Sequence, residues 1–392
     1  MAEIGVVVTG MGAVSSLGYG VPAMWQGLVA GRCGIGALTR IDPTPHRIRH
    51  AGQVPEPLGI NATADPVERF LMAACFEALE QAQAEGALRE TVGLALGSNF
   101  GAMSTTERLL TRQLPAESGG NLDAVIDGVT CAVAEKLGLG GTRTTLSLSC
   151  ASGNAALGCA ADLIRSGRAQ AVLAGGYDAI SEVVWAGLSS LRAMSADALR
   201  PFDKRRDGTI FGEGAGVMLL ESEAHALRRG VPPLAVLAGY ATTSNAFHMT
   251  HPDEDGAGMA RAMRAALRDA GMAPEELQHV NAHATGTQPN DRLETAAIKS
   301  VFGEHARRLA INGIKSMLGH AMGAASALEA IATVMAVREG VVPPTIGLEQ
   351  PDPDCDLDYV PLHARQMPVR AALNNSAGFG GCNASVIFRR VQ

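Results

Sequence analysis

Three side chains in this sequence have the type and setting needed for nucleophilic and acid–base chemistry: Cys150, His283 and His320. Cys150 follows the hydroxyl-rich run TTLSLS and precedes Ala-Ser-Gly, so we expect its thiol on a sharp strand-to-helix turn. The dipole and the free N–H groups at the start of that helix favour a thiolate and can bind an oxyanion. The alternative is inert packing, which is the usual role of a buried cysteine and the one expected for Cys159.

Both histidines lie among small residues. His283, in NAHATGT, follows a short apolar stretch and would lie at the carboxyl end of a strand, where α/β sheets place their sites. His320, in KSMLGHAMGAAS, is an ionisable residue in a segment that implies close backbone approach. Lys315 and Glu329 flank it and could form a buried ion pair. The alternatives are a structural histidine at a strand end and an ordinary surface lysine and glutamate.

Two glycine-rich segments complete the set of candidates. NNSAGFGGCNAS, at residues 374–385, places glycines around Phe379 and predicts a flexible, non-helical loop. This loop is either a turn before the last strand, expected at 385–388, or a gate whose N–H groups face a ligand. PFDKRRDGTIFGEGAG, at residues 201–216, indicates a structured loop with charges against a glycine-rich turn.

The elements that must position these residues alternate between short apolar strands and alanine-rich helices. A helix over 151–165 ends at Ser166-Gly167, and the next strand begins within a few residues. Strand, helix and strand with short joints form a βαβ unit, which implies a parallel sheet covered on both faces. The predicted strands of the first half are 4–9, 92–96, 144–148, 171–174 and 217–220.

The second half repeats this alternation after a boundary expected within 225–233, which divides the chain into 1–229 and 230–392. Each half contains a strand, a turn of small residues and an alanine-rich helix, so the pattern indicates a duplicated α/β unit. The helices expected in the second half are 260–270, 293–301 and 323–337, and the earlier strands are 234–240, 280–282 and 309–311.

Composition excludes several classes of protein. The 392 residues are 47% hydrophobic and 18% charged, which permits a sizeable core and excludes wholesale disorder. A net charge of −7 argues against a general nucleic-acid or anionic-membrane surface. Seven cysteines without a C-x-x-C pair disfavour disulfides and structural zinc, and indicate reduced thiols in a cytosol. Without a signal-peptide pattern or an apolar run long enough to span a bilayer, we expect a soluble, cytoplasmic protein.

Taken together, these segments closely resemble the β-ketoacyl-acyl carrier protein synthases, the Cys-His-His condensing enzymes of type II fatty-acid and polyketide synthesis. The resemblance implies a thiolase-type fold, a duplicated five-layer αβαβα architecture. The separations agree as well, with 133 residues from the cysteine to the first histidine and 37 to the second. The motifs, in order, are VVVTGMGAVSSLG, MWQGLVAGRCGI, SLSCASG, RPFDKRRDGTIFGEGAG, FHMTHPDEDGAGM, NAHATGT, KSMLGHAMGAAS and GFGGCNAS.

This resemblance implies a role for each residue. Cys150 would take an acyl chain from an acyl carrier protein as a thioester, with its own N–H and that of Phe379 as the oxyanion hole. His283 and His320 would then donate through Nε2 to the thioester carbonyl of malonyl-carrier protein. Loss of CO2 gives an enolate whose carbon attacks the Cys150 thioester. The family uses no metal or redox cofactor.

Supporting roles follow from the same likeness. Lys315 and Glu329 match an ion pair that orders the site. Thr285 and Thr287 match positions that meet the phosphopantetheine arm, and Phe379 matches a gate between the acyl and malonyl sites.

Three residues depart from the family pattern. Cys382 stands where the family usually has Thr, and although thiolases use a second cysteine as acid and base, we favour a simple substitution. Ala284 replaces a Gly after the first histidine, which should stiffen that turn. Phe100, in GSNFGAM, falls in a segment that forms the bottom of the acyl pocket near the dimer interface, so its ring predicts a shortened or redirected pocket.

Carrier proteins are strongly acidic, so the resemblance also requires a basic docking face despite the net charge. Such a face would differ from that of relatives and suggests a dedicated carrier protein in a specialised pathway, although a solvated charge run explains the same residues. The basic residues concerned are Arg192 at a family docking position, Lys204, Arg205 and Arg206 near it in sequence, and Arg69 with Arg47 and Arg49.

The leading hypothesis is a homodimeric, decarboxylative condensing enzyme, with a heterodimer of paralogous subunits also possible. One alternative is a pocket-shaping partner subunit like a chain-length factor; such relatives typically lose the cysteine that is present here at position 150. Another is a thiolase-like enzyme that acts on coenzyme A thioesters without decarboxylation, which a requirement for malonyl thioester would exclude.

Overall fold

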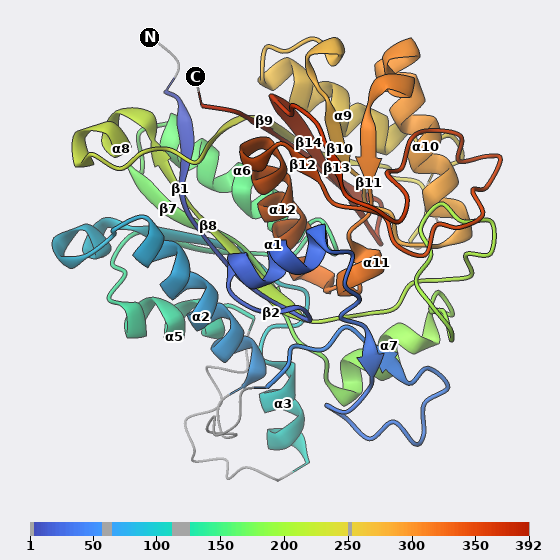
Figure 1. The fold of residues 1–392 in the computed structure, drawn as a ribbon. Helices are drawn as coiled ribbons and strands as arrows, with labels where there is room; N and C mark the ends of the chain where they lie inside the picture. The colour runs from blue at the N-terminus through green and yellow to red at the C-terminus, as the bar shows by residue number, and fades with distance from the viewer. Residues whose placement is uncertain (1–3, 57–64, 112–125, 250–252, 392) are drawn as a thin grey trace.

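A single large mixed sheet, made of two similar halves, organises the molecule (Figure 1). The computed structural model describes residues 4–56, 65–111, 126–249 and 253–391. The strands of the first half are β1 (Val6–Ser15), with the short β2 (Gly18–Tyr19) beside it, β5 (Gly93–Gly97), β6 (Arg143–Leu146), β7 (Ala171–Asp178) and β8 (Gly214–Ser222). Those of the second half are β9 (Ala235–Ser244), β10 (His279–Asn281), β11 (Ala310–Asn312), β14 (Ala371–Gly378) and β15 (Cys382–Arg389).

The two halves share one topology. The strands run in the order β11-β10-β14-β15-β9-β1-β8-β7-β5-β6. In each half, therefore, the third strand along the chain forms the edge, followed by the second, fourth, fifth and first. The pairing directions also agree, because β10 and β5 each lie between two parallel neighbours, whereas β15 and β8 pair antiparallel on both sides. The expected duplication of an α/β unit is thus confirmed in the fold.

Helices cover both faces of each half and give five layers. The side chains of β8 alternate: Val217 and Leu219 pack with residues of α2 and α5, whereas Met218 and Leu220 pack with residues of α6 and α12. On the other half, Ile387 of β15 packs with residues of α9 and α10. The helices in these layers are α2 (Pro66–Gln81), α5 (Gly128–Leu137), α6 (Ser152–Arg165), α9 (Ala257–Asp269), α10 (Gln288–Phe302) and α12 (Ala325–Glu339).

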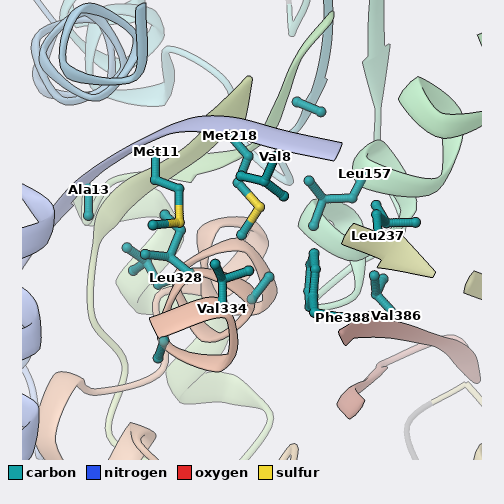
Figure 2. Packing of buried hydrophobic residues seen from close by; sticks show 14 of the residues in the cluster. Val8, Met11, Ala13, Leu157, Met218, Leu237, Leu328, Val334, Val386 and Phe388 are labelled. Atoms are coloured by element: carbon teal, nitrogen blue, oxygen red, sulfur yellow. The ribbon is translucent and has the colours of Figure 1, made fainter. Parts of the chain in front are cut away.

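The central layer joins the halves. Figure 2 shows Leu157 of α6, Leu328 of α12 and Phe388 of β15 in one buried cluster with residues of β1 and β8. The sheet itself is continuous through only three Cα pairs between β1 and β9, such as Val7 with Val236. The two central helices, α6 and α12, therefore form most of the contact between the halves by packing against each other and against strands of both halves.

Further short elements lie around this frame. The helices are α1 (Val21–Val29), α3 (Met103–Leu110), α7 (Glu182–Ser190), α8 (Glu223–Arg229) and α11 (Lys315–Leu318). The strands are β3 (Gly36–Ala37), β4 (His50–Ala51), β12 (Val341–Val342) and β13 (Arg365–Gln366). The predicted division between residues 229 and 230 falls at the end of α8, and it stays a prediction.

Several element boundaries differ from the sequence-based expectation. The helix expected over 151–165 is α6, and it ends as predicted with Gly167 at φ 70°. Helix α10 begins at Gln288 instead of 293. Hydrophobic periodicity could not detect its first turn, because this turn is polar and contains Pro289. Strand β15 begins at Cys382, so residues 382–384 form its first pairs and only 379–381 form the turn.

Candidate active site

Cys150, His283 and His320 converge at the centre of the molecule. The cysteine Sγ and the ring nitrogens of the two histidines lie within 4.8 Å of one another, and all three residues are buried. The two imidazole rings meet edge to face, with centroids 5.6 Å apart. Each side chain follows the carboxyl end of a strand: Cys150 follows β6, His283 follows β10 and His320 comes after β11. The three predicted residues are therefore brought together from both halves.

The turn that carries Cys150 is held by hydroxyl groups. Ser149 adopts a left-handed backbone with φ 51°, which is unfavourable for a residue with a side chain and characteristic of functional turns. Ser152 Oγ accepts the Leu148 N–H at 2.8 Å and donates to the Ser149 carbonyl at 2.6 Å. From β14, Ser376 Oγ donates to the carbonyl oxygen of Cys150 at 3.0 Å. The expected sharp strand-to-helix turn is present.

The surroundings of the Cys150 thiol favour its protonated form. Burial raises its pKa to about 12, and the nearby Lys315 charge lowers it by less. This direction is opposite to the expectation that the helix start favours a thiolate. At 7% exposure, the loss of hydration of the sulfur anion outweighs the effect of the Lys315 charge.

Hydrogen bonds at Nδ1 and a lowered pKa favour neutral histidines that carry their proton on Nε2. His320 Nδ1 accepts the Met322 N–H at 3.2 Å, and His283 Nδ1 lies 3.3 Å from Lys315 Nζ. A donor at Nδ1 leaves the proton on Nε2 in each neutral ring. Burial, reinforced by the Lys315 charge, holds the pKa of both imidazoles well below the usual value. Both rings can therefore present an N–H group to an oxygen atom in the site.

Lys315 and Glu329 form the predicted ion pair behind His283. Their side chains are each 2% exposed, and Lys315 Nζ contacts the Glu329 carboxylate. The same ammonium donates to the His283 carbonyl oxygen at 2.6 Å. Burial raises the pKa of Glu329 to about 7, and the Lys315 charge opposes that rise. This lysine therefore contacts both a histidine ring and its backbone.

Phe379 lies in the three-residue turn between β14 and β15, beside the Cys150 turn. Its carbonyl oxygen accepts a hydrogen bond from Ser149 Oγ at 2.8 Å. A Cβ atom at Gly378 would lie 3.0 Å from the Cys150 nitrogen, so the two turns are in close contact. Within the described residues, neither the Cys150 N–H nor the Phe379 N–H donates to another residue. Two backbone donors are thus available near the thiol.

A cavity of about 340 Å³ leads from these side chains to the surface. Thr285 and Thr287 line it, and their hydroxyls lie 2.9 Å apart. The exposed Arg192 is also on its wall, so the cavity opens beside that residue. Cys382 is not among the lining residues, although its neighbours in the chain are. Its thiol therefore has no contact with the cavity that contains Cys150.

Phe100 lies one layer behind the cavity wall. Its ring packs against a buried cluster that includes Phe211 and Met322, and it does not line the cavity itself. Phe211 does line the cavity, and its ring centroid is 5.5 Å from that of His320. The ring of Phe100 thus packs behind the cavity wall formed by Phe211, and its effect on an acyl pocket stays a prediction.

The basic residues considered for docking differ in their exposure and in whether a carboxylate already pairs with them. Arg192 and Lys204 are exposed. Arg206 is 2% exposed and pairs with Asp352, so grouping it with a surface patch was wrong, because its charge is used inside the fold. The remaining residues are placed as follows: Arg205 pairs with Asp203 and Glu349, Arg69 pairs with Glu56, Arg47 is exposed, and Arg49 is exposed with its guanidinium bound to carbonyl oxygens of Thr44 and His46.

Two buried acids on α10 were missed by the sequence analysis. Glu294 accepts the N–H groups of His283 at 2.7 Å and Ala284 at 2.9 Å, and burial raises its pKa. Ala284 has φ 45°, so this carboxylate secures a strained turn. Asp291 similarly accepts the Gly286 N–H at 3.2 Å. The sequence signal that could have indicated them is an acidic residue on the helix face that the hydrophobic residues predict to be buried.

A cysteine with two N–H-donating histidines, on a duplicated five-layer fold, defines a condensing enzyme of the thiolase type. Residues 4–226 match the family described as "Beta-ketoacyl synthase, N-terminal domain", and residues 234–349 match "Beta-ketoacyl synthase, C-terminal domain". The chain belongs to the β-ketoacyl synthase family, whose members are acyltransferases.

Full-length relatives agree with this assignment. The chain is 40% identical to 3-oxoacyl-[acyl-carrier-protein] synthase 2 of Synechocystis, over 99% of the chain and 98% of the relative. It is 38% identical to the enzyme of the same name from Coxiella burnetii, over 98% of each.

Solved structures show the same architecture. One is a type II polyketide synthase ketosynthase in complex with its acyl carrier protein and bound to the hexaketide, with TM-score 0.93, 33% identity, and coverage of 99% of this chain and 100% of that one. Another is the ishigamide ketosynthase/chain length factor, with TM-score 0.90, 36% identity and full coverage of both chains. The thiolase-type fold is confirmed. No helix in the described part of the chain is long and apolar enough to cross a membrane.

Proposed function

We propose that this enzyme elongates an acyl chain by two carbons through decarboxylative Claisen condensation of malonyl-carrier protein. The observation that carries the proposal is the convergence of one thiol and two neutral imidazole donors within 4.8 Å, on a cavity that opens beside a surface arginine. A nucleophile alone would suit many acyl transfers. The pair of N–H donors is suited in addition to an enolate oxygen, the charge that develops when malonyl thioester loses CO2.

In the first half-reaction, the Cys150 sulfur attacks the thioester carbonyl of an acyl-carrier protein. The N–H groups of Cys150 and Phe379 stabilise the oxyanion, and the phosphopantetheine thiol leaves with the proton that the cysteine gives up. Because burial raises the pKa of the Cys150 thiol, this transfer requires the oxyanion hole more than a preformed thiolate. Opening and closing of the Phe379 turn would separate this step from the next.

The second half-reaction uses the two histidines. The malonyl thioester carbonyl accepts the Nε2–H groups of His283 and His320, with the phosphopantetheine arm against Thr285 and Thr287. The bond to the carboxylate carbon breaks, CO2 leaves, and the electron pair forms the enolate. Its carbon attacks the Cys150 thioester, the tetrahedral intermediate expels the cysteine thiolate, and the thiolate takes a proton from water. Neutral imidazoles suit this task because they remain donors throughout.

An acyl carrier protein is the partner that this proposal requires. In the solved complex with a similar ketosynthase, the partner is named as an acyl-carrier protein. Arg192 is exposed on the cavity wall, and Lys204 is exposed three residues before the lining residue Asp207. Cations at these positions would attract an acidic partner despite the net charge of −7. Arg205 and Arg69 would contribute less, because carboxylates already pair with them.

The donor set also bears on cofactors. Cys150, His283 and His320 are residue types that bind metals, but zinc would need a deprotonated thiol and unprotonated imidazole nitrogens at about 2.0–2.3 Å. Here a hydrogen-bond donor approaches Nδ1 of each histidine, which leaves the proton on Nε2 and suits hydrogen bonds to a carbonyl. We therefore propose a reaction without a metal or redox cofactor, with substrates on the phosphopantetheine arm, and expect EDTA to leave the rate unchanged.

The active assembly that we propose is a cytoplasmic homodimer. The cytoplasmic location is proposed because the seven cysteines of each chain include no C-x-x-C pair, a pattern typical of reduced thiols in a reducing compartment. A heterodimer with a paralogous subunit is the second candidate, favoured by the similarity to a ketosynthase/chain length factor structure. In such a pair this chain would be the catalytic member, because it retains Cys150.

Intact-protein mass spectrometry tests the proposal. The enzyme is incubated with acyl-carrier proteins of graded chain length and then with malonyl-carrier protein, with Cys150→Ala as the matched control. We expect an adduct on Cys150 that disappears on the chase and yields a ketoacyl product two carbons longer. No adduct at any length would favour the non-catalytic partner subunit. An adduct removed by acetyl-coenzyme A, and not by malonyl-carrier protein, would favour the thiolase-like alternative.

A further inference from the structure

Asp178, at the end of β7, is a buried carboxylate outside the set of residues discussed so far. Its side chain is fully buried, and four uncharged donors converge on it. They are Ser98 Oγ at 2.8 Å, the Asn99 N–H at 3.1 Å, the Phe100 N–H at 3.1 Å and the Gly323 N–H at 2.7 Å. Burial raises the pKa of this carboxyl to about 6, and these hydrogen bonds act in the opposite direction. So many donors on one buried acceptor indicate a demand for fixed geometry.

One oxygen of Asp178 holds the turn that orients His320. Gly323, which donates to Oδ2, directly follows Met322, whose N–H donates to His320 Nδ1 at 3.2 Å. Met322 has a left-handed backbone with φ 55°, a conformation that its surroundings must maintain. A Cβ atom at Gly323 would lie 2.7 Å from Asp178 Oδ2, so the backbone is pressed against the carboxylate. The protonation of His320 is therefore linked to Asp178 through two consecutive peptide groups.

The other oxygen holds the segment that faces the Cys150 turn. Asp178 Oδ1 accepts from Ser98, and the next residue, Asn99, places its side-chain oxygen 3.2 Å from Ser152 Oγ. Ser152 is the residue that accepts the Leu148 N–H in the nucleophile turn. Phe100, the third residue of the segment, carries the ring behind Phe211. The carboxylate thus lies between the histidine turn and the nucleophile turn.

We propose that Asp178 is a positioning residue that keeps His320 in its Nε2-protonated form through the Met322–Gly323 turn. The kinetic part of this inference rests on the proposed function, since it concerns enolate stabilisation. The tautomer part does not, because it follows from hydrogen bonds alone. Asp178 itself does not contact the cavity, so its effect on the reaction passes through His320.

An amide in place of the carboxylate would break this arrangement selectively. Asp178→Asn keeps the shape of the side chain but has one acceptor oxygen and one NH2 group. Three donors converge on Oδ1, so the amide oxygen should take that position. Its NH2 group would then face the Gly323 N–H, and two donors would repel. The turn should shift, and the hydrogen bond from Met322 to His320 should weaken, whereas the Cys150 side retains its acceptor.

The test combines a spectroscopic and a kinetic measurement. In protein labelled with 15N-histidine, with His320→Ala to assign the signal, we expect His320 to be Nε2-protonated in the wild type. In Asp178→Asn we expect a mixture of tautomers. Decarboxylation of malonyl-carrier protein should fall about 10- to 100-fold, with acyl transfer to Cys150 changed less than about threefold.

Two further variants make the outcome decisive. Gly323→Ala places a methyl group against Asp178 and should displace the same turn without changing the charge of Asp178. It should therefore give the same tautomer mixture even if Asp178→Asn does not fold. Glu221→Gln is the matched control, because Glu221 is an equally buried carboxylate bound to Thr9 and Arg229, away from the cavity. It should leave the tautomer and the ratio of the two half-reactions unchanged.

An unchanged His320 signal in both turn variants, or an equal loss of both half-reactions, would overturn the inference. Failure of the proposed function gives a different result, since the wild type itself would then not decarboxylate malonyl-carrier protein. In that case the 15N signals still decide whether Asp178 fixes the tautomer.

Discussion

Lys315 contacts His283 twice: its Nζ atom donates to the His283 carbonyl oxygen at 2.6 Å and lies 3.3 Å from Nδ1 of the same residue. One ammonium thus fixes both the backbone position and the protonated nitrogen of this imidazole. Glu329, also buried, compensates the charge. The ion pair therefore has a role in the site beyond stability, and the two effects can be separated by mutation.

Lys315→Met should unfold more easily and lose activity. Removing one partner of a buried ion pair leaves an uncompensated charge, which typically lowers the free energy of unfolding by about 3–5 kcal/mol. The double variant Lys315→Met/Glu329→Gln should recover much of this stability, because no buried charge remains, but should not recover malonyl decarboxylation. Chemical denaturation and a decarboxylation assay measure the two quantities. A double variant with restored activity would show that His283 does not need the ammonium.

Alkylation of Cys150 by iodoacetamide should be slow and strongly dependent on pH. Burial raises the pKa of the thiol to about 12, so the reactive thiolate is scarce near neutrality. The rate should rise about tenfold for each pH unit between roughly pH 7 and 9, without a plateau. Mass spectrometry of the peptide that contains residue 150 measures the rate, with Cys150→Ala as the blank. A plateau below pH 8 would show a thiolate already present in the resting enzyme.

His279 should make stability depend on pH. It lies in β10 at 1% exposure, its Nδ1 is 2.8 Å from the Ala310 carbonyl, and burial lowers its pKa to about 4. Since its pKa in the unfolded chain is about 6.5, unfolding takes up a proton between these values. The free energy of unfolding should therefore fall with falling pH, by about 1.4 kcal/mol per pH unit from this group.

His279→Asn isolates that contribution. Asparagine can keep the hydrogen bond to the carbonyl oxygen but cannot titrate. Between pH 6.5 and pH 4, the free energy of unfolding should depend less steeply on pH in the variant. The difference in slope should correspond to the uptake of about one proton, or about 1.4 kcal/mol per pH unit. Buried carboxyl groups with raised pKa values, such as Glu329, act in the opposite direction but are common to both proteins. Equal slopes would mean that His279 takes up its proton over the same pH range in the folded and unfolded states.

Phe100→Ala should lengthen the acyl chain that the enzyme accepts. The half-buried ring packs in the cluster behind Phe211, so its removal opens space beyond the cavity wall. The loss of stability should be smaller than the about 3–5 kcal/mol typical of a fully buried ring. Phe76→Ala, which removes a ring that is 51% exposed on α2, is the control. An unchanged maximum chain length, in the acyl-transfer assay on Cys150, would contradict a role of Phe100 in the pocket.

Charge reversal at the exposed residues Arg192 and Lys204 should weaken carrier binding. Arg192→Glu and Lys204→Glu should each raise KM for the acyl-carrier protein about tenfold while kcat is unchanged, because an exposed charge mainly affects association. The effect should shrink at high salt. Arg228→Glu, an exposed residue of α8, makes the same change in net charge elsewhere. An equal rise in KM for the Arg228 variant would indicate a general effect of charge.

Sequence reasoning found residues whose local pattern is distinctive, and missed those defined by three-dimensional contacts. The turn of Cys150 and the helix that follows it were predictable, because small residues and helical periodicity are local signals. The protonated thiol was not, since burial of Cys150 depends on β14 and on the second half of the chain. Arg206 looks like its exposed neighbour Lys204 in the sequence, and only its contact with Asp352 reveals a buried role. Asp178 carries no local signal, because its four donors lie 78 or more residues away in the chain.

The two halves have the same strand order, but equivalent connections in them carry different functional residues. The connection after the third strand carries Cys150 in the first half, and Lys315 and His320 in the second. Neither copy holds both the nucleophile and the enolate donors. In the proposed mechanism, one copy would hold the acyl chain as a thioester and the other would generate the carbanion. Separate polypeptides for the two halves would each be inert, and turnover would require their reassembly into one particle.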